Sequence, residues 1–340
     1  MDLYFLEKSI PFNGNDLNSA LIGGTEKVLI NIANELARHS NFNVKVFNNT
    51  KENIVVNKVN WININSCHNY KSPDVVISFS DMNLFTLFKC NKNYLWSHSI
   101  QNLEKFIRKK QLIPYLLYRP ILILEGEYHF KKRSILTSFF GKRIIKLAPD
   151  YEFINEEINM NELPSKKCIF TTKSDRNLDF LINAWRQIYT LNKDAELYIN
   201  PPYNVSEDLI NLKIKLRHKG SKNNLINDLK SSKIMLVPGH KGEVFCLAAE
   251  EARELCLPIV TMGYGSLYER VEHNKTGYIA RNLNEFVNYT HKLLNDKDLY
   301  LKFRSHLLSL RNTRNFSHVA NELIKPILGP SGVSIGQILP

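Results

Sequence analysis

The chain has 340 residues, enough for about two domains, and its 44% hydrophobic and 23% charged residues are ordinary for a globular protein. Its net charge of +12 raises the question of nucleic-acid binding, but no nucleic-acid-binding module is present, so we expect no nucleic-acid partner. Five scattered cysteines, no export signal in "MDLYFLEKSI" and no uncharged apolar run of about 18 residues predict a reduced cytoplasmic protein without structural zinc or a membrane-spanning helix.

The first half of the chain alternates strand and helix patterns. Residues 2–10 predict a strand, and Gly23-Gly24-Thr25 then introduces a helix. The apolar residues of that helix recur at helical spacing: Val28, Leu29, Ile32, Ala33, Leu36 and Ala37. Residues 43–48, 73–80 and 93–98 predict further strands. Continuous β-branched runs separated by helices indicate a parallel sheet covered on both faces.

A basic stretch follows between residues 101 and 146, with eleven Lys or Arg against three Glu. It contains the apolar run "QLIPYLLYRPILILE", which Pro114, Arg119 and Pro120 interrupt too often for a membrane span. Basic residues flanking apolar ones suggest a face that lies on anionic lipid, at the inner surface of a membrane. The alternative is a solvated basic surface with a buried strand between.

The second half repeats the alternation. Its predicted strands are 166–172, 195–200, 233–239 and 258–263, and its predicted helices are 178–191, 243–257 and most of 283–328. Between the two halves the pattern relaxes into a polar loop at 147–167, where we place the domain boundary. Two doubly wound domains in tandem predict a cleft between the carboxyl ends of two sheets.

One segment, "PGHKGEVFCLAAEEARELCLPIV", carries the strongest chemical signal. A loop with Gly239 and Gly242 precedes the helix predicted over 243–257, and N–H groups at a helix start favour an anion. On that helix, Glu243 and Glu251 would stand about 12 Å apart along the axis. Such a pair suits a ligand with hydroxyls at both ends and a phosphate between, as in a nucleotide-sugar. On these residues alone, a purely structural role for both glutamates stays open.

The segment resembles the E-x7-E signature of the family 4 retaining glycosyltransferases, which have the GT-B fold. The matching residues are Glu243, Phe245, Glu251, Ala252, Pro258, Ile259, Val260, Gly265, Glu269, Val271, Thr276 and Gly277. "IGGTEKVLINIANELARHSNFNVKVF" resembles the first loop and helix of the family, and "YLWSH" the strand before its active-site histidine. "KSDRNLDFLINAW" resembles its donor-phosphate segment, and "NFSHVANELIKPIL" its closing helix.

The resemblance implies an α/β protein of the GT-B class, with two Rossmann-like doubly wound domains facing a cleft. Residues 1–155 would form the acceptor-side domain and 156–312 the nucleotide-sugar domain. Residues 313–328 would be the closing helix that returns to the first domain, and 329–340 a loose tail.

The chain also departs from the family pattern. Cys246 and Cys256 replace two family glycines, which puts in doubt how closely backbone and sugar approach. The basic loop is "TTKSDR", without a glycine, and Lys173 and Arg176 are aligned to its two cations. The hinge glycine is absent from "APDYEF".

The resemblance implies a role for each site residue. The implied donor-binding set is Gly23, Gly24, Lys173, Arg176, Glu243, Val244, Phe245, Cys246, Leu247 and Glu251, and the implied catalytic set is His98, Glu243, Lys173 and Arg176. Lys173 and Arg176 would neutralise the departing diphosphate in place of a metal ion. Glu251 would hold the ribose and Glu243 the donor sugar, while His98 would orient that sugar rather than act as a nucleophile.

The implied function is retaining, metal-independent sugar transfer to a glycan or lipid-linked acceptor, in cell-surface polysaccharide or glycolipid synthesis. A UDP-sugar is the first expectation for the donor and a GDP-sugar the second, with no separate cofactor. The pattern at 296–298, "DKD", mimics a metal-binding D-x-D but falls between helical segments, so we interpret it as a polar turn. Two alternatives remain: a nucleotide-sugar epimerase of the same fold, and a non-catalytic homologue that binds nucleotide-sugars.

Overall fold

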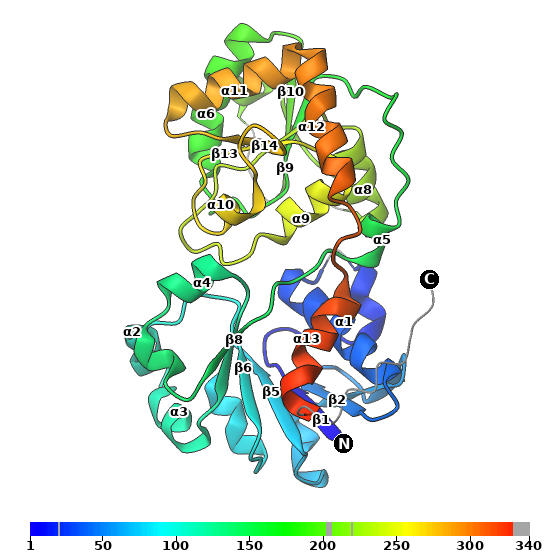
Figure 1. The fold of residues 1–340 in the computed structure, drawn as a ribbon, viewed down its shortest axis with the longest axis vertical. Helices are drawn as coiled ribbons and strands as arrows, with labels where there is room; N and C mark the ends of the chain where they lie inside the picture. The colour runs from blue at the N-terminus through cyan, green and yellow to red at the C-terminus, as the bar shows by residue number, and fades with distance from the viewer. Residues whose placement is uncertain (20, 202–205, 219, 329–340) are drawn as a thin grey trace. The chain divides into compact units, whose positions relative to one another are not determined.

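The computed structural model describes residues 1–19, 21–201, 206–218 and 220–328 (Figure 1). These residues form two compact units. The first consists mainly of Met1–Leu17, Leu21–Leu147 and Phe316–Leu328, and the second of Ala148–Asn315. Apart from a short piece near residue 18, the chain leaves the first unit after Leu147 and returns to it at Phe316. The predicted loose tail, 329–340, lies outside the described residues.

The first unit is built on an eight-stranded sheet. Its strands are β1 (Asp2–Leu6), β2 (Asn43–Asn48), β3 (Ile54–Val56), β4 (Val59–Asn63), β5 (Val75–Phe79), β6 (Asn93–Trp96), β7 (Ile121–Leu124) and β8 (Lys142–Ile144). Their order is β3-β4-β2-β1-β5-β6-β7-β8, and only β3 runs antiparallel to its neighbour. Phe5 of β1 pairs with Val46 of β2 on one side and with Ile77 of β5 on the other. The strand order reverses between β1 and β5, which makes this a topological switch point.

Helices cover this sheet. They are α1 (Gly24–Arg38), α2 (Leu103–Arg108), α3 (Leu112–Tyr118), α4 (Glu127–Lys132) and α13 (Phe316–Leu328), with short 3-10 turns η1 (Gly14–Asn18), η2 (Ile64–Asn69), η3 (Met82–Leu87) and η4 (Ile135–Ser138). All six apolar residues predicted to form the stripe of α1 are buried, so that prediction is confirmed. The closing helix α13 lies beside α1 in the same unit (Figure 1).

The second unit is built on a six-stranded, fully parallel sheet. Its strands are β9 (Lys167–Phe170), β10 (Glu196–Ile199), β11 (Ile214–Leu216), β12 (Ile234–Leu236), β13 (Ile259–Thr261) and β14 (Gly277–Ile279). They follow the order β11-β10-β9-β12-β13-β14, the doubly wound arrangement, with its switch point between β9 and β12.

The helices of the second unit lie on both faces of its sheet. They are α5 (Tyr151–Ile154), α6 (Leu178–Leu191), α7 (Glu207–Asn211), α8 (Lys222–Lys230), α9 (Leu247–Glu254), α10 (Leu267–Arg270), α11 (Leu283–Asn295) and α12 (Lys297–Ser309). Cys168 and Phe170 of β9 point into one apolar cluster and Ile169 into another, as expected for a strand buried on both faces. Phe180 of α6 packs edge-on against Phe286 of α11 with ring centroids 5.5 Å apart, and Figure 1 shows these two helices side by side.

Two expectations from the sequence can be compared with these elements directly. The basic stretch 101–146 contains α2, α3, α4 and the strand β7, so the buried strand of the alternative interpretation is present. Asp296 of the D-x-D pattern caps α12 by accepting a hydrogen bond from the Leu299 N–H. Among the described residues, no helix is both long and apolar enough to cross a membrane.

Candidate active site

The switch point of the second unit brings together two loops that are far apart in sequence. The loop after β9 carries Lys173 and Arg176, and the loop after β12 carries His240 and Glu243. Because β9 and β12 are neighbouring parallel strands, both loops emerge at the same edge of the sheet. In open α/β sheets this edge is where ligands bind.

Arg176 is the centre of a polar group at this edge. Its Nε lies 3.7 Å from Oε2 of Glu243, and its Nη1 lies 3.1 Å from Nδ1 of His240. The side chains of Arg176 and Glu243 are 24% and 20% exposed, so both reach solvent. Asn177 fixes the same loop by donating to the Gly239 carbonyl. A cation and a carboxylate are therefore held close together at the strand ends.

His240 is a functional candidate that the sequence did not indicate. Its Nδ1 accepts hydrogen bonds from the Gly242 N–H at 2.9 Å and from Arg176. Since a guanidinium can only donate, the proton of the neutral ring must be on Nε2. His240 thus joins the loop after β12 to Arg176. A single histidine without a neighbouring ligand residue gave no signal for this role, because its partners meet only through the sheet order.

The helix predicted over 243–257 is shorter, and this prediction was wrong at both ends. Helix α9 begins at Leu247, because Cys246 has φ +64 and cannot continue a right-handed helix. It ends at Glu254, two residues before Cys256, which has φ +53. Glu243 therefore lies in a loop before α9 rather than in its first turn. The two cysteines that replace family glycines both occupy the left-handed region that glycine favours.

Helix α9 begins four residues after Glu243 in the chain. The first N–H groups of a helix lack intrahelical partners, and here they belong to Leu247 and Ala248, just after the buried residues Val244, Phe245 and Cys246. Glu251 is half-buried on α9, one turn after these groups. Lys173 is exposed at the beginning of the loop after β9.

Two glycines allow the loops at this edge to approach each other. Gly239 has φ +90 and Gly265 has φ +69. A Cβ on Gly265 would lie 2.4 Å from the His240 carbonyl oxygen and 2.7 Å from that of Glu243. The Ser266 N–H donates to the same Glu243 carbonyl at 2.9 Å. The absence of a side chain at 265 therefore sets the position of Glu243.

A buried group of ion pairs packs against Phe245 in the loop before α9. The guanidinium of Arg270 lies 4.3 Å from the ring centroid of Phe245 and donates to Glu250 of α9 at 2.7 Å. Arg270 and Glu250 are both almost fully buried. Glu250 also pairs with Arg253 on the same helix. Phe245 was predicted as a donor-site residue, whereas Arg270 was not, because its contact with α9 comes from tertiary packing.

In the first unit, Gly23 and Gly24 lie at the start of α1. Gly23 has φ −90, which any residue adopts. Its N–H donates to Oε2 of Glu26 at 3.0 Å, and Ser9 donates to the other oxygen of that carboxylate. The chain's own Glu26 thus already supplies an anion at this helix start.

His98 lies two residues beyond β6 and faces a buried carboxylate. Its Nδ1 is 2.5 Å from Oε1 of Glu125, which directly follows β7. The ring of His98 packs against Phe79 and Trp96, and its backbone N–H donates to Ser80. Glu125 was not predicted, because residues 98 and 125 meet only where β6 and β7 pair.

A second histidine lies behind this pair. Nδ1 of His129 accepts from the Glu125 N–H at 3.3 Å, and its Nε2 lies 3.0 Å from the Ser99 carbonyl oxygen. A ring that accepts at one nitrogen and donates at the other is neutral. Burial lowers the pKa of His129, which agrees with that state. His98 is thus the ring that directly faces the carboxylate side chain.

The switch point of the first unit contains a cavity of about 410 Å³. It is lined by Glu7, Lys8, Ser9, Phe79, Ser80, Asp81, Asn83, Lys109 and Gln111. Glu7 follows β1 directly and is 5% exposed. Its Oε1 accepts from the Ser9 N–H at 2.6 Å, and its Oε2 has no hydrogen-bond partner among the described residues. Burial raises the pKa of this carboxyl, so Glu7 is a candidate that the sequence analysis missed.

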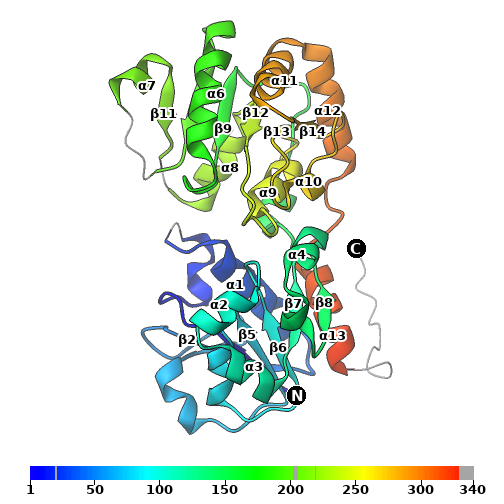
Figure 2. The same ribbon diagram turned by 90° about the vertical axis from the view of Figure 1, so that its left-hand side faces the viewer.

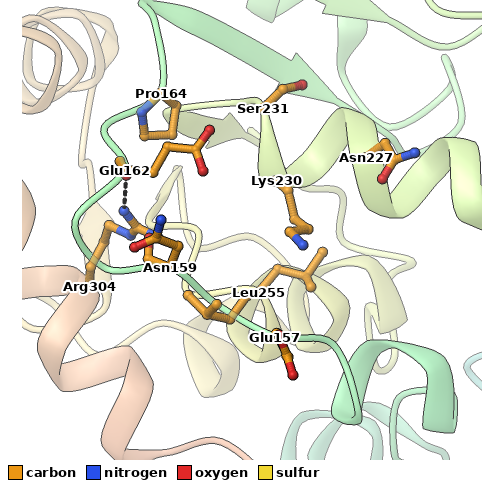
Figure 3. Close-up of a pocket in the computed structure, with 10 residues that line it drawn as sticks. Glu157, Asn159, Glu162, Pro164, Asn227, Lys230, Ser231, Leu255 and Arg304 are labelled. Carbon is orange, nitrogen blue, oxygen red and sulfur yellow. Dashed lines mark hydrogen bonds between the residues drawn. The ribbon is translucent and has the colours of Figure 1, made fainter.

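Another cavity, of about 460 Å³, lies at the opposite edge of the second sheet (Figure 3). Its wall includes Lys230 at the end of α8 and Arg304 of α12. Lys230 pairs with Glu156 at 2.5 Å, and Arg304 donates to the carbonyls of Glu162 and Asn159. These cations hold the segment before β9 against the rest of the unit. We therefore assign the charged residues of this cavity a structural role and not a catalytic one.

The side chains that could ligate a metal ion are dispersed in both units. Within the ranges that the structure describes, no three His, Cys, Asp or Glu side chains come together in an arrangement that could hold a metal ion. The five cysteines all fall within these ranges and are free thiols.

The two doubly wound sheets, with their polar groups at the carboxyl ends, define the GT-B class of fold, and known proteins share it. WaaG, a glycosyltransferase involved in lipopolysaccharide biosynthesis, is 14% identical over 97% of this chain and 100% of its own, with a TM-score of 0.69. HepE (Alr3699) of Anabaena, in complex with UDP and glucose, is 14% identical over 96% and 98%, with a TM-score of 0.68. Sucrose-phosphate synthase of Thermosynechococcus elongatus is 12% identical over 95% and 97%, with a TM-score of 0.70.

Sequence comparison matches a large part of the second unit to a known family. Residues 170–306 match the family model of glycosyl transferases group 1, and no curated protein matches the chain by sequence. That segment contains Arg176, His240, Glu243 and Glu251. The chain is thus an α/β protein with the GT-B fold and a glycosyl transferases group 1 domain, and it is a glycosyltransferase.

Proposed function

We propose that this protein transfers a sugar from a nucleotide-sugar to a glycan or lipid-linked acceptor, with retention of anomeric configuration and without a metal ion. Its role would be the synthesis of a cell-surface polysaccharide or glycolipid. The observation that carries the proposal is the group formed by Arg176, His240 and Glu243 beside the start of α9. It lies in the group 1 domain, at the switch point of the second sheet.

The diphosphate of the donor would lie against Arg176 and Lys173. The planar guanidinium of Arg176 can donate two parallel hydrogen bonds to a phosphate. The N–H groups of Leu247 and Ala248 add a partial positive charge at the start of α9. Fixed cations and amide groups of this kind stabilise a leaving diphosphate in the role that a metal ion has elsewhere.

The two glutamates would bind the hydroxyl groups of the donor. Glu243, held near Arg176 by the tight contact at Gly265, would accept hydrogen bonds from the sugar. Glu251, further along α9, would accept from the ribose. His240 would keep Arg176 in place through its unprotonated Nδ1, while its Nε2–H is available to a phosphate oxygen.

In the transfer step, the acceptor oxygen bonds to the anomeric carbon on the face from which the diphosphate leaves. The bond between that carbon and the phosphate oxygen breaks, and the nucleoside diphosphate takes the bonding electrons. The acceptor's hydroxyl proton passes to the leaving phosphate oxygen, so no separate base is needed. Arg176 stabilises the charge that develops on the leaving group.

The acceptor would bind to the first unit. The cavity beside Glu7 offers carboxylate, amide and hydroxyl groups that suit sugar hydroxyls. His98, fixed by Glu125, would orient the transferred sugar. A UDP-sugar is the donor that we propose first, because HepE of Anabaena is similar over nearly its whole length and is in complex with UDP and glucose. A GDP-sugar is the second candidate.

The test is a thermal-shift titration with UDP-, GDP-, ADP-, CMP- and dTDP-sugars, without added metal and with EDTA. A ligand that binds the folded state raises Tm by mass action. We expect a rise with one nucleotide class that survives EDTA and disappears in Glu251→Ala. The matched control is Glu207→Ala, which removes an exposed carboxylate from α7.

The other outcomes distinguish the alternatives. No response to any donor would favour a scaffold that has lost donor binding, and a response that requires a divalent ion would refute the metal-independent mechanism. Conversion of the donor to its epimer without an acceptor would favour an epimerase. For the stereochemistry, the coupling between H1 and H2 of the product sugar in NMR reports retention or inversion.

A further inference from the structure

The first unit has a dense group of exposed apolar side chains between residues 103 and 139. Its members are Leu103, Ile107, Ile113, Leu116, Leu117, Ile135, Leu136 and Phe139. Ile135 is 80% exposed and Phe139 76%, and Ile113 and Leu117 are about equally accessible, at 71% and 70%. Elsewhere among the described residues, exposed large apolar side chains are scattered along the sequence. We call the eight residues the apolar face.

Three short segments carry the apolar face, and Tyr115 ties two of them together. The Tyr115 hydroxyl donates to the Leu136 carbonyl at 2.7 Å and accepts from the Phe139 N–H at 2.8 Å. Its ring packs against Phe106 of α2 and Phe140 after η4. Buried contacts thus hold α2, α3 and η4 side by side. Figure 2 shows α2 and α3 on the side of this unit that faces the viewer.

Exposed cations belong to the same stretch of chain as the apolar face. The exposed basic residues of the same stretch are Arg108, Lys109, Lys110, Arg119, Lys131, Lys132, Lys142, Arg143 and Lys146, against exposed Glu104 and Glu127. Lys132 and Arg133 also lie over aromatic rings of α4, at 5.9 Å from Tyr128 and 4.0 Å from Phe130. Apolar side chains next to a strong excess of positive charge are typical of surfaces that bind anionic bilayers.

We propose that the apolar face is a membrane-docking surface that inserts its side chains into the interfacial region of an anionic bilayer. The helices involved have six and seven residues, so they would lie on the bilayer rather than cross it. Ile135, Phe139 and Leu117 would enter the acyl region, and the surrounding Lys and Arg would contact anionic headgroups.

Charge favours a bilayer over a second copy of the chain. In a symmetric dimer the same surface meets itself, which would bring the basic residues of both copies together. Like charges placed in this way oppose association, whereas anionic lipids are attracted to them. The inference deepens the proposed function, because a lipid-linked acceptor is found at a bilayer surface. Docking itself needs neither donor nor transfer.

The experiment is flotation of the full chain with vesicles, without any nucleotide-sugar. One vesicle type contains equal parts of phosphatidylglycerol and phosphatidylcholine, and the other contains phosphatidylcholine alone. We expect binding to the anionic vesicles, weakened at high salt because screening shortens the range of charge interactions. Ile135→Ser with Phe139→Ser should reduce binding about tenfold or more, and Lys131→Ala with Lys132→Ala about fivefold per charge.

The matched control is Val55→Ser with Ile210→Ser, which removes two exposed apolar side chains outside the apolar face. This control should bind like the wild type, and circular dichroism checks that each variant is folded. Absence of binding to anionic vesicles would overturn the proposal, as would equal loss in the control. The proposal would also be overturned if the chain bound no vesicles but dimerised with increasing concentration, and if Ile135→Ser with Phe139→Ser abolished that dimer. The partner of the apolar face would then be a second copy of the chain. Because the flotation assay contains no nucleotide-sugar, a negative result would not bear on sugar transfer. The thermal-shift titration tests sugar-donor binding separately.

Discussion

The close contact at Gly265 gives the sharpest prediction. Replacing Gly265 by Ala places a methyl group 2.4 Å from the His240 carbonyl oxygen and 2.7 Å from that of Glu243. These neighbours are backbone atoms, so they can move only if the two loops separate. Separation would also break the hydrogen bond from Ser266 N–H to the Glu243 carbonyl.

The magnitude follows from two terms. Alanine at the observed φ of +69 is destabilised by about 1–2 kcal/mol. Forcing an extra methyl into a filled contact adds about 1–3 kcal/mol. The free energy of unfolding of the Gly265→Ala variant should therefore be about 2–5 kcal/mol lower than that of the wild type. For a domain of this size, that lowers Tm by roughly 4–20 °C.

The assay is thermal unfolding followed by circular dichroism, with and without the best nucleotide-sugar. Because the displaced loop carries His240 and Glu243, the variant should also lose the rise in Tm that the donor gives. The control is Gly23→Ala, where φ is −90 and the nearest neighbour of the new Cβ is the carboxylate end of the Glu26 side chain rather than backbone. That change should alter stability by at most about 1 kcal/mol. A Gly265→Ala protein with wild-type Tm would refute the argument.

The remaining predictions concern buried charges. Burial raises the pKa of Glu7 in the folded state above its ordinary 4.5. As the pH rises, the Glu7 carboxyl therefore ionises in the unfolded chain before it ionises in the folded chain. The folded state loses stability over this range of pH. Glu7→Gln should therefore have a higher Tm than the wild type at neutral pH and an equal Tm below pH 4.5, and a difference that is independent of pH would contradict the assignment. Glu125→Ala should reduce the free energy of unfolding by about 1–3 kcal/mol in urea titrations, since it leaves the buried Nδ1 of His98 without its hydrogen-bond partner, whereas Glu127→Ala on the exposed side of α4 should not. Arg270→Lys keeps the charge but loses the planar stacking on Phe245, so we expect about 1–2 kcal/mol less stability and a weaker donor response, and unchanged donor affinity would show that Phe245 is held by other contacts.

Strongly periodic segments were predictable from the sequence. The helix over 178–191 has the predicted bounds, and α1 buries its whole predicted stripe. Such segments are long enough for their apolar spacing to fix both the element and its buried face. The start of α9 was not predictable in this way. Cys246 adopts the left-handed conformation, which is rare for a cysteine. Neither its residue type nor the apolar spacing around it therefore indicated that the helix begins only after residue 246.

The candidate site was predictable only in part. Arg176 and Glu243 could be proposed from motif spacing, and the structure places them 3.7 Å apart. His240 and Glu125 could not, because each gains its partner through strand order rather than local sequence. Residues 176 and 240 meet because β9 and β12 are neighbours although β10 and β11 intervene in the chain.

The return of the chain to the first unit has a practical consequence for dissecting this protein. Helix α13 buries Phe316, Val319, Ala320, Leu323, Ile324 and Ile327 in the unit that contains the N-terminus. Topologically, the group 1 domain is therefore an insertion into the first unit. A fragment that stops at residue 147 would expose the apolar surface that α13 covers on α1, and would be prone to aggregate. Producing the first unit alone would require residues 1–147 joined by a linker to the segment beginning at Phe316, whereas 148–315 is a continuous piece of chain.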